Sequence, residues 1–262
     1  MTTDAAVLFE VSNGVATITL NRPEQMNAIN AELSAGLMES LKQVRTRDDV
    51  RVALITGSGR AFCAGADLRS RADGPAAASG VAGLFRTDDT VGFHEFETKK
   101  PIIGAVNGYC LGGGFEIALS CDLLIASEAA TFGLPEITLG FFPLAGAPVK
   151  LPRGVPRVVA NDLLFTGERI DARKAYEYGI VSRVVPPADL MPTAQAMAAK
   201  IAGYAPLAVR AMLELVRRQG NLPEPEAMRL ASTMRWAIGQ TNDAKEGPRA
   251  FAEKRTPVYR GE

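Results

Sequence analysis

The sequence predicts an α/β protein in which strands and helices alternate at first and helices alone follow. Short apolar runs bounded by Gly, Pro or Asn, a pattern typical of strands, recur up to residues 180–185, and helical spacing separates them. From Pro187 onward no strand pattern occurs, and apolar residues recur only at helical intervals. We therefore expect a mixed α/β part over residues 1–186 and a helical part over residues 187–262.

The first elements are predicted from local patterns. The runs 7–11 and 15–20 predict two strands, joined by a tight turn at Ser12-Asn13-Gly14. Asn30 is expected to cap a helix with apolar residues at helical spacing, and residues 52–56 predict a buried strand. Residues 61–67 predict a loop of small side chains that leads into a short helix.

Further along the chain, residues 71–83, rich in Ala, Gly, Ser and Asp, predict a mobile loop, and a helix is expected over about 87–98. Pro101 precedes a predicted strand, and a glycine loop then opens a short helix. Asp171 is expected to cap a later helix. The remaining predicted elements are strands over 102–106, 123–126, 130–132 and 180–185, and a helix over about 113–120.

Composition excludes several classes of protein. Of 262 residues, 47% are apolar and 22% charged, which is ordinary for a globular protein, and the formal net charge of zero disfavours a nucleic-acid partner. No apolar run is long enough to span a bilayer and no secretory signal is visible, so no membrane association is expected. Three cysteines without a Cys-x-x-Cys pair favour a reducing compartment. We expect a cytoplasmic protein.

The sequence has too few histidine and cysteine residues for a typical zinc site with Cys and His ligands. With His94 as the one histidine, a zinc site of the usual kind is hard to build, and we expect no metal. No Ser or Cys nucleophile motif accompanies His94, which favours a histidine on a helix surface. Cys63 is either a reactive thiol or a small buried filler, and the second interpretation is favoured.

Two glutamates stand in distinctive loops: Glu116 in Leu-Gly-Gly-Gly-Phe-Glu and Glu136 in Phe-Gly-Leu-Pro-Glu. A single glutamate is most often a surface carboxylate, but a pair in such loops suits general acid–base catalysis. Glu116 is expected in the first turn of a helix, where the dipole favours the ionised form of a base. Glu136 has apolar neighbours, and burial there would raise its pKa and suit an acid.

The three glycines before Glu116 leave backbone N–H groups uncovered at a helix start. This pattern indicates either an oxyanion site or tight packing between strand and helix. Neither a Gly-x-Gly-x-x-Gly dinucleotide motif nor a Gly-x-x-x-x-Gly-Lys phosphate loop occurs. The small residues 61–67 also expose N–H groups, although a turn capped by Asp67 explains them equally well when they are taken alone.

Together these motifs resemble the crotonase, or enoyl-CoA hydratase/isomerase, family nearly from end to end. The N-terminal signature Asn-Arg-Pro-Glu-Gln-Met-Asn-Ala and the Asn-Gly-Tyr-Cys-Leu-Gly-Gly-Gly-Phe-Glu motif are specific as a set. The resemblance is carried by residues 21–28, 61–67, 107–116, 132–140, 179–181 and 251–255.

The resemblance implies a spiral of ββα turns followed by helices that pack subunits into homotrimers, often hexamers. It implies an acyl-CoA thioester as substrate and no cofactor, because coenzyme A is part of the substrate. The backbone N–H groups of Ala66 and Gly113 would form the oxyanion hole. The implied coenzyme A contacts are Ala64, Asp67 and Leu68, with Lys254 as a further candidate for the phosphates.

Hydratases of this family resemble the chain in carrying both glutamates. The resemblance therefore implies hydration of a 2-enoyl-CoA, with Glu116 helping to activate water for C3 and Glu136 delivering a proton at C2. The alternatives are an isomerase, a carnitinyl-type dehydratase, or a non-catalytic paralogue that binds acyl-CoA or RNA, although the balanced charge disfavours RNA.

One segment departs from the family pattern. Many hydratases have a Pro-Gly-Ala-Gly-Gly-Thr-like stretch where residues 143–148 read Pro-Leu-Ala-Gly-Ala-Pro. Leu144, Pro148 and the preceding Phe141-Phe142 add bulk and rigidity. We expect this segment to narrow the range of substrates or to mark a different crotonase reaction.

Overall fold

The structure, a computed structural model, describes residues 5–68 and 97–262. His94, the predicted loop at 71–83 and nearly all of the predicted helix at 87–98 lie outside these ranges. Of that helix, Glu97 and Thr98 are described, and neither is helical.

The described strands form two sheets, and successive turns of the chain give one strand to each. β3, β5 and β7 lie in the first sheet, while β4, β6 and β8 follow them in the second, so the chain winds as a spiral. The first sheet has the order β1 (Val7–Ser12), β2 (Val15–Leu20), β3 (Val52–Gly57), β5 (Ile102–Val106), β7 (Leu123–Ser127) and β10 (Arg183–Val185). The second has the order β4 (Ala61–Cys63), β6 (Tyr109–Leu111), β8 (Thr131–Gly133) and β9 (Arg169–Asp171). The predicted ββα spiral is confirmed.

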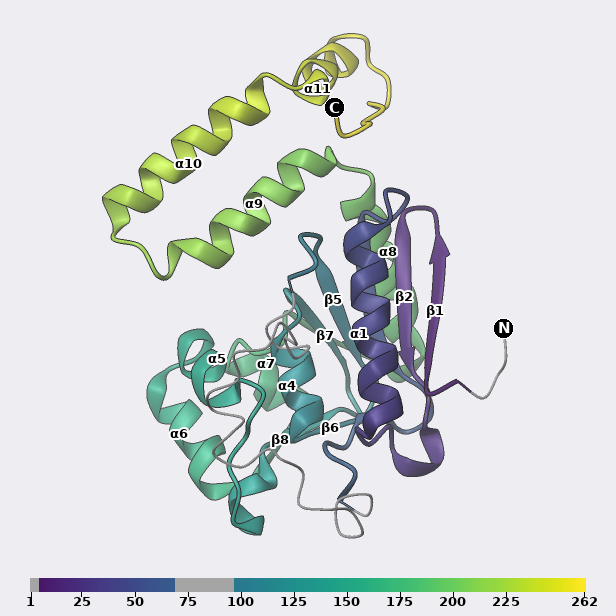
Figure 1. Ribbon diagram of the computed structural model, residues 1–262, viewed down its shortest axis with the longest axis vertical. Helices are drawn as coiled ribbons and strands as arrows, with labels where there is room; N and C mark the ends of the chain where they lie inside the picture. The colour runs from purple at the N-terminus through teal and green to yellow at the C-terminus, as the bar shows by residue number, and fades with distance from the viewer. Residues whose placement is uncertain (1–4, 69–96) are drawn as a thin grey trace.

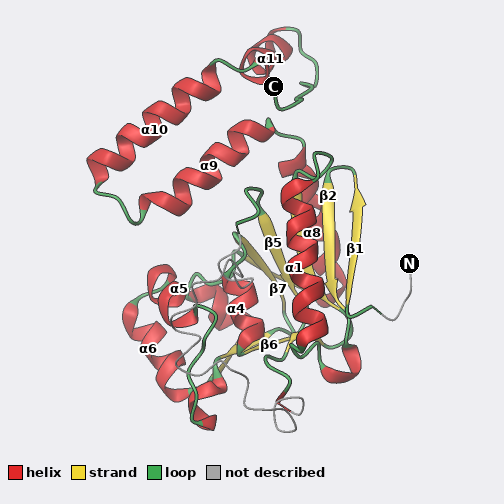
Figure 2. Cartoon of the chain, in the orientation of Figure 1, coloured by secondary structure: helices red, strands yellow, loops and turns green. Residues whose placement is uncertain are grey.

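Helices cover both faces of the first sheet, which explains the unbroken apolar run of β3. Successive strand residues point to opposite faces. Ala53 and Ile55 therefore pack in the core beneath α1 (Ala31–Thr46), whereas Val52 and Leu54 pack beneath α8 (Leu190–Ala202). Figures 1 and 2 show α1 in front of the sheet and α8 behind it.

Local sequence signals near the N-terminus are confirmed. Asn13 and Gly14 join β1 to β2 with φ values of 50° and 79°, the conformation that a two-residue hairpin loop requires. The Asn30 side chain caps α1 by accepting a hydrogen bond of 2.9 Å from the N–H of Leu33. The predicted inward face of α1 is buried at Leu33, Leu37, Leu41 and Val44.

The short strands were harder to predict. The predicted loops at 61–67 and after 106 contain β4 and β6, because strands of three residues form only through pairing with distant neighbours. The strand predicted over 180–185 begins only at Arg183. The N–H groups of Ile180 and Val181 both donate to the carbonyl of Ala175 and close helix α7 (Ala172–Glu177) instead.

Helices make up much of the chain between β6 and α8. The helix α4 (Gly113–Leu119) follows β6, and α5 (Ala147–Gly154) and α6 (Arg157–Thr166) follow the short 3-10 helix η2 (Pro135–Leu139). Asp171 caps α7 as predicted, with its carboxylate accepting from the N–H of Lys174 at 2.8 Å. These helices surround the end of the second sheet (Figure 1).

The last three helices project from the body as a C-terminal arm, residues 206–262 (Figure 1). It contains α9 (Pro206–Gln219), α10 (Glu224–Gly239) and α11 (Asn242–Ala252). Arg217 ties α9 to the body through Asp122 at 2.8 Å. Although α8 was predicted to belong to the helical part, it packs into the core of the sheet; the division at residue 186 stays a prediction. Among the described helices, none is long and apolar enough to cross a membrane.

The packing between α4 and the second sheet provides a test of the core. Phe132 is fully buried against Phe115, with ring centroids 5.3 Å apart. We expect Phe132→Ala to lower the free energy of unfolding by about 3–5 kcal/mol through lost burial and the cavity left behind. Urea denaturation measures this. Phe165→Ala, at a position 71% exposed, is the control and should cost less than about 1 kcal/mol. Equal losses for the two variants would contradict the packing described here.

Candidate active site

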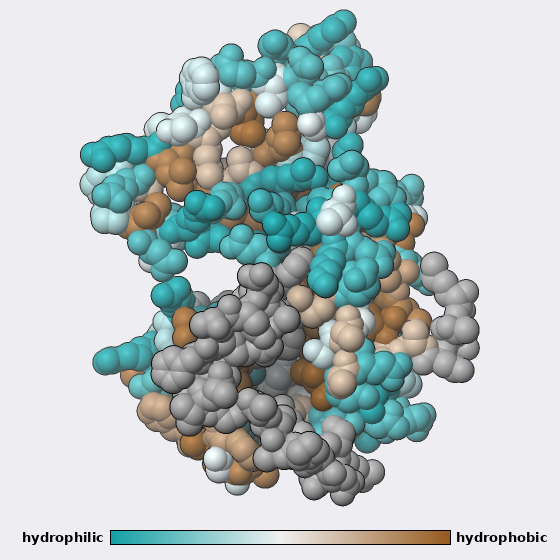
Figure 3. Space-filling model, viewed as in Figure 1, coloured by the Kyte–Doolittle hydropathy of each residue, from teal (hydrophilic) through white to brown (hydrophobic). Residues whose placement is uncertain are grey.

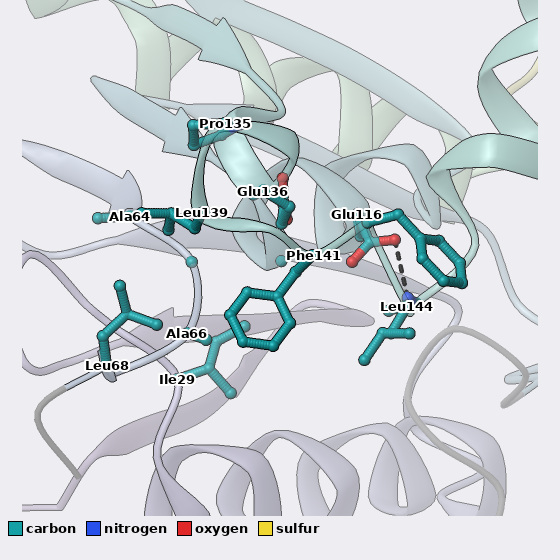
Figure 4. Close-up of a pocket in the computed structure, with 15 residues that line it drawn as sticks. Ile29, Ala64, Ala66, Leu68, Glu116, Pro135, Glu136, Leu139, Phe141 and Leu144 are labelled. Carbon is teal, nitrogen blue, oxygen red and sulfur yellow. Dashed lines mark hydrogen bonds between the residues drawn. The ribbon is translucent and has the colours of Figure 1, made fainter. Parts of the chain in front are cut away.

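A pocket of about 250 Å³ lies where the loop after β4, the loop after β6 and the segment after β8 meet. Figure 4 shows Glu116 and Glu136 on one side of this pocket and Ala64, Ala66 and Leu68 on another. The structure thus brings together six of the residues selected from the sequence. The pocket is lined by Ile29, Ala64, Gly65, Ala66, Leu68, Gly112, Gly113, Glu116, Pro135, Glu136, Leu139, Phe141, Phe142, Leu144 and Ala145.

The N–H of Ala66 is oriented by a short parallel bridge to Ile29. The Ile29 N–H donates to the carbonyl of Gly65 at 2.7 Å, and the Ile29 carbonyl accepts from the N–H of Asp67 at 3.0 Å. In such a bridge the residue between the two bonded neighbours directs its own N–H to the opposite side. Within the described residues, the Ala66 N–H has no acceptor.

The glycine loop reaches the same pocket because two glycines allow backbones to come close. A Cβ on Gly65 would lie 3.4 Å from the nitrogen of Gly113, so the two loops are neighbours there. Gly112 has a φ of 53°, and a Cβ on it would lie 2.8 Å from Oε1 of Glu136. The Gly113 N–H, at the start of α4, donates to no acceptor in the described part of the chain.

The third glycine of the loop has the packing role. A Cβ on Gly114 would lie 2.1 Å from the carbonyl oxygen of Cys63, so α4 could not approach β4 with any other residue there. Both interpretations of the glycine motif therefore hold, but for different glycines. Gly112 and Gly113 line the pocket, whereas Gly114 brings the helix against the sheet.

Glu116 is 3% exposed, and one of its oxygens is held by the backbone. Its Oε1 accepts hydrogen bonds from the N–H groups of Ala145 at 2.8 Å and Ala147 at 2.9 Å. Burial nevertheless raises the pKa of Glu116 to about 7, and the nearby Glu136 carboxylate adds to the rise. The helix dipole was expected to favour the ionised form of Glu116, but the net shift of its pKa is upward, because desolvation in this buried site is the larger effect.

Glu136 behaves as its apolar surroundings predicted. Burial raises its pKa, and its Oε2 is buried without a hydrogen-bond partner among the described residues. A buried oxygen without a partner is rare in folded proteins, and a catalytic role is one explanation for it. The Glu136 carboxylate in turn raises the pKa of Glu116, so the protonation of one carboxyl affects the other.

Two predicted coenzyme A contacts lie outside the pocket lining. The Asp67 carboxylate pairs with the Arg22 guanidinium at 3.1 Å. Lys254 follows α11 on the C-terminal arm, far from α4 within this chain (Figure 1). Their contacts with coenzyme A stay predictions.

The segment that departs from the family pattern has two separate effects. The side chains of Phe141, Phe142 and Leu144 line the pocket and are each more than half exposed. The backbone of the same segment holds Glu116 through Ala145 and Ala147, and Gly146 between them has a φ of 103°. Sequence reasoning missed these two amides, because backbone groups carry no residue-type signal.

Cys63 is fully buried, and burial raises the pKa of its thiol to about 12. A thiol with such a pKa is not ionised at neutral pH and is a poor nucleophile. The interpretation of Cys63 as a small buried filler is confirmed.

Comparison with known families identifies the scaffold on which this site is built. The model of the enoyl-CoA hydratase/isomerase family matches residues 10–262. The chain belongs to this family, the crotonases. It is 42% identical to (E)-benzylidenesuccinyl-CoA hydratase from Thauera aromatica, across 97% of this chain and 99% of that protein. It is 41% identical to carnitinyl-CoA dehydratase from Proteus mirabilis, across 94% and 95% of the two chains.

Solved crotonase structures have the same fold. The crystal structure of enoyl-CoA hydratase from Mycobacterium tuberculosis superposes with a TM-score of 0.91 at 35% identity, covering 99% of this chain and 100% of that chain. This crotonase is therefore an enoyl-CoA hydratase-like hydro-lyase, an acyl-CoA hydratase or dehydratase.

The raised pKa of Glu116 predicts how stability depends on pH. From its ordinary pKa of 4.5 to about 7, the folded protein keeps a proton that the unfolded chain has released, so stability falls as pH rises. Between pH 5 and pH 8 we expect Glu116 to account for a loss on the order of 2 kcal/mol. Glu116→Gln keeps the Oε1 acceptor and should remove this loss.

Urea denaturation of wild type and Glu116→Gln at both pH values measures the difference. Glu128→Gln, at an exposed position, is the control and should retain the wild-type pH dependence. An unchanged pH dependence in Glu116→Gln would show that Glu116 has an ordinary pKa.

Proposed function

We propose that this crotonase catalyses the reversible addition of water across the 2,3 double bond of a 2-enoyl-CoA with an apolar acyl group. The observation that carries the proposal is one pocket that holds a buried carboxyl, that of Glu116, and a half-buried one, that of Glu136. Beside them lie the N–H groups of Ala66 and Gly113, which have no acceptor among the described residues. Addition of water to an enoyl thioester needs these three components: a base, an acid and a site for the oxyanion.

The two N–H groups are proposed to bind the thioester oxygen. When the oxygen of water adds to C3, electrons move to this oxygen and an enolate forms, so donors fixed in advance stabilise the transition state more than the substrate. Gly113 is the first residue of α4, and the helix dipole adds partial positive charge at its N–H. Loss of one such donor typically costs about 3–4 kcal/mol of barrier.

Glu116 is proposed as the base and Glu136 as the acid. Because Oε1 of Glu116 is held by two amides, Oε2 is the oxygen that would take the proton from water. A pKa of about 7 keeps a useful fraction ionised at neutral pH and makes it basic enough to take a proton. Burial raises the pKa of Glu136, which favours its protonated form, and it would give that proton to C2. The products are the 3-hydroxyacyl thioester, a protonated Glu116 and an ionised Glu136, and proton exchange restores the pair.

The acyl group is proposed to contact the apolar side of the pocket. Leu139, Phe141, Phe142 and Leu144 line it and are each more than half exposed. Contact with an apolar acyl group would cover these side chains, which supports a substrate without a polar chain. The related proteins are named for benzylidenesuccinyl and carnitinyl groups, each of which carries a charge, so the proposed apolar group is supported by the lining of this pocket and not by those names.

The proposed reaction needs no cofactor. Two carboxyls and two N–H groups supply the proton transfers and the charge stabilisation, and coenzyme A enters as part of the substrate. We propose a cytoplasmic location on the cysteine pattern described above.

The arm is proposed to assemble the chain into a homotrimer or a hexamer. Neither α9 nor α10 has a buried residue, although both carry large apolar side chains. Figure 3 shows apolar residues gathered along these helices. Exposed apolar groups of this size are typical of surfaces that bind another chain. The most exposed are Met212 at 62%, Val216 at 59%, Met228 at 62% and Trp236 at 70%.

Crotonyl-CoA tests the proposed reaction. Wild type should remove the conjugated enoyl absorbance with uptake of one water, seen by mass. Glu116→Gln and Glu136→Gln should each lower the rate by roughly 10²-fold or more, because each removes one proton transfer. Glu128→Gln is the control and should be fully active.

A variant that carries both Glu116→Gln and Glu136→Gln and keeps the full wild-type rate would contradict this mechanism. A shifted double bond without water uptake would identify an isomerase instead, and tight binding without turnover would identify a binding protein.

Sedimentation equilibrium tests the assembly. We expect a mass three or six times that of the 27.8 kDa chain. Trp236→Asp should shift the protein towards smaller species, because a charge would be buried at the interface. Tyr176→Asp, which changes a 55% exposed side chain on α7, is the control and should leave the mass unchanged. A wild-type monomer would refute the proposed assembly.

A further inference from the structure

The N-terminal signature loop, residues 21–28, takes no part in lining the pocket, yet it lies directly behind one of its walls. Its backbone pairs with the loop that carries Ala66. The Ala64 N–H donates to the carbonyl of Met26 at 3.0 Å, and Ile29, just after the signature, bonds to both neighbours of Ala66. The position of the Ala66 N–H therefore depends on the position of this loop.

Asn27 fixes the inner end of the signature loop. Its side chain is fully buried, with Oδ1 accepting from the N–H of Arg22 at 2.7 Å and Nδ2 donating to the carbonyl of Ala61 at 2.8 Å. Its φ of 55° is a conformation that asparagine tolerates better than most residues. Asn27 thus joins the signature loop to β4, the strand before Ala66.

Arg22 fixes the outer end. Its Nη1 and Nη2 both lie 3.1 Å from Oδ2 of Asp67, and Nη1 also donates to the carbonyl of Ala28. The two side chains of this ion pair are 16% and 15% exposed, so solvent screens it only in part. One guanidinium therefore ties the residues that flank Ile29 and Ala66 to each other, Ala28 on one strand of the bridge and Asp67 on the other.

We propose that Arg22, acting through Asp67, is a positioning residue for the oxyanion-hole N–H of Ala66, an inference that rests on the proposed function. Asp67 is covalently joined to Ala66, and within residues 5–68 and 97–262 the Ala66 N–H makes no hydrogen bond that would hold its direction. A reacting group displaced by about 1 Å can lose 10²-fold in rate, so the ion pair matters for geometry more than for net charge. Asp67 is thereby assigned to support of the loop.

The fork of the guanidinium explains why arginine suits this position. Two nitrogens reach Asp67 while one of them also reaches a carbonyl, an arrangement that the single ammonium of lysine reproduces poorly. Arg22→Lys should therefore keep the charge and lose part of the positioning. Arg22→Met should lose both.

The first test separates positioning from binding. With crotonyl-CoA, Arg22→Met should lower kcat roughly 10- to 100-fold and change KM less than about threefold, because the hole stabilises the enolate more than the substrate. The kcat values of Arg22→Lys and Asp67→Asn should lie between those of Arg22→Met and wild type. If Arg22→Met does not fold, these two variants still test the proposal.

A matched control exists at the other end of the sheet. Arg217 pairs with Asp122 at 2.8 Å, and these side chains are 27% and 19% exposed. Arg217→Met breaks an ion pair of similar burial without touching the pocket. It should lower the melting temperature by a comparable amount while kcat stays at the wild-type value. A kcat loss in Arg217→Met equal to that in Arg22→Met would overturn the proposal.

The second test measures how strongly the oxyanion hole stabilises an enolate, with a ligand that is bound but not converted. Acetoacetyl-CoA ionises at C2 to an enolate with its own absorbance, and a functional hole lowers the pKa of the bound ligand. When Arg22→Met is saturated with acetoacetyl-CoA, the apparent pKa of the bound ligand should be about one unit higher than in wild type. One unit corresponds to a tenfold loss of enolate stabilisation. An unchanged ligand pKa would overturn the role of Arg22. Wild type that binds the probe without lowering its pKa would instead overturn the proposed oxyanion hole.

Discussion

The whole site depends on the close approach of two backbone loops. The loop after β4 and the chain at the end of β6 meet where a Cβ on Gly65 would lie 3.0 Å from the carbonyl oxygen of Leu111, and a Cβ on Gly114 would lie 2.1 Å from the carbonyl oxygen of Cys63. Only glycine allows backbones this close. The approach places the N–H groups of Ala66 and Gly113, neither of which has an acceptor in the described ranges, in one pocket. It also brings α4, with Glu116, against the second sheet.

Burial sets the electrostatics of the pocket more than any single charge does. It is the first cause of the raised pKa at both glutamates, and their proximity adds to it at Glu116. Two backbone amides from residues 145–147 oppose the rise by binding Oε1 of Glu116. The segment whose side chains depart from the family pattern therefore supplies a contact through its backbone, with Gly146 between the two amides at a φ of 103°.

Much of the fold could be predicted because its signals are local. The hairpin at Asn13-Gly14, the cap at Asn30 and the buried strand β3 each follow from neighbouring residues and periodicity. The short strands β4 and β6 could not, because three residues form a strand only when the partner strand is already in place. The packing of α8 was not visible in the sequence for a related reason, since helical spacing does not show that this helix packs against the sheet.

The sequence by itself determined the family, the two glutamates and the glycine motif, because these depend on residue type and order. Only the tertiary structure decided how the glycines divide their roles, that Glu116 has a pKa near 7, and that Asp67 pairs with Arg22. Each of these depends on contacts between segments distant in sequence. Burial and backbone direction are properties of the folded chain, and no residue type encodes them.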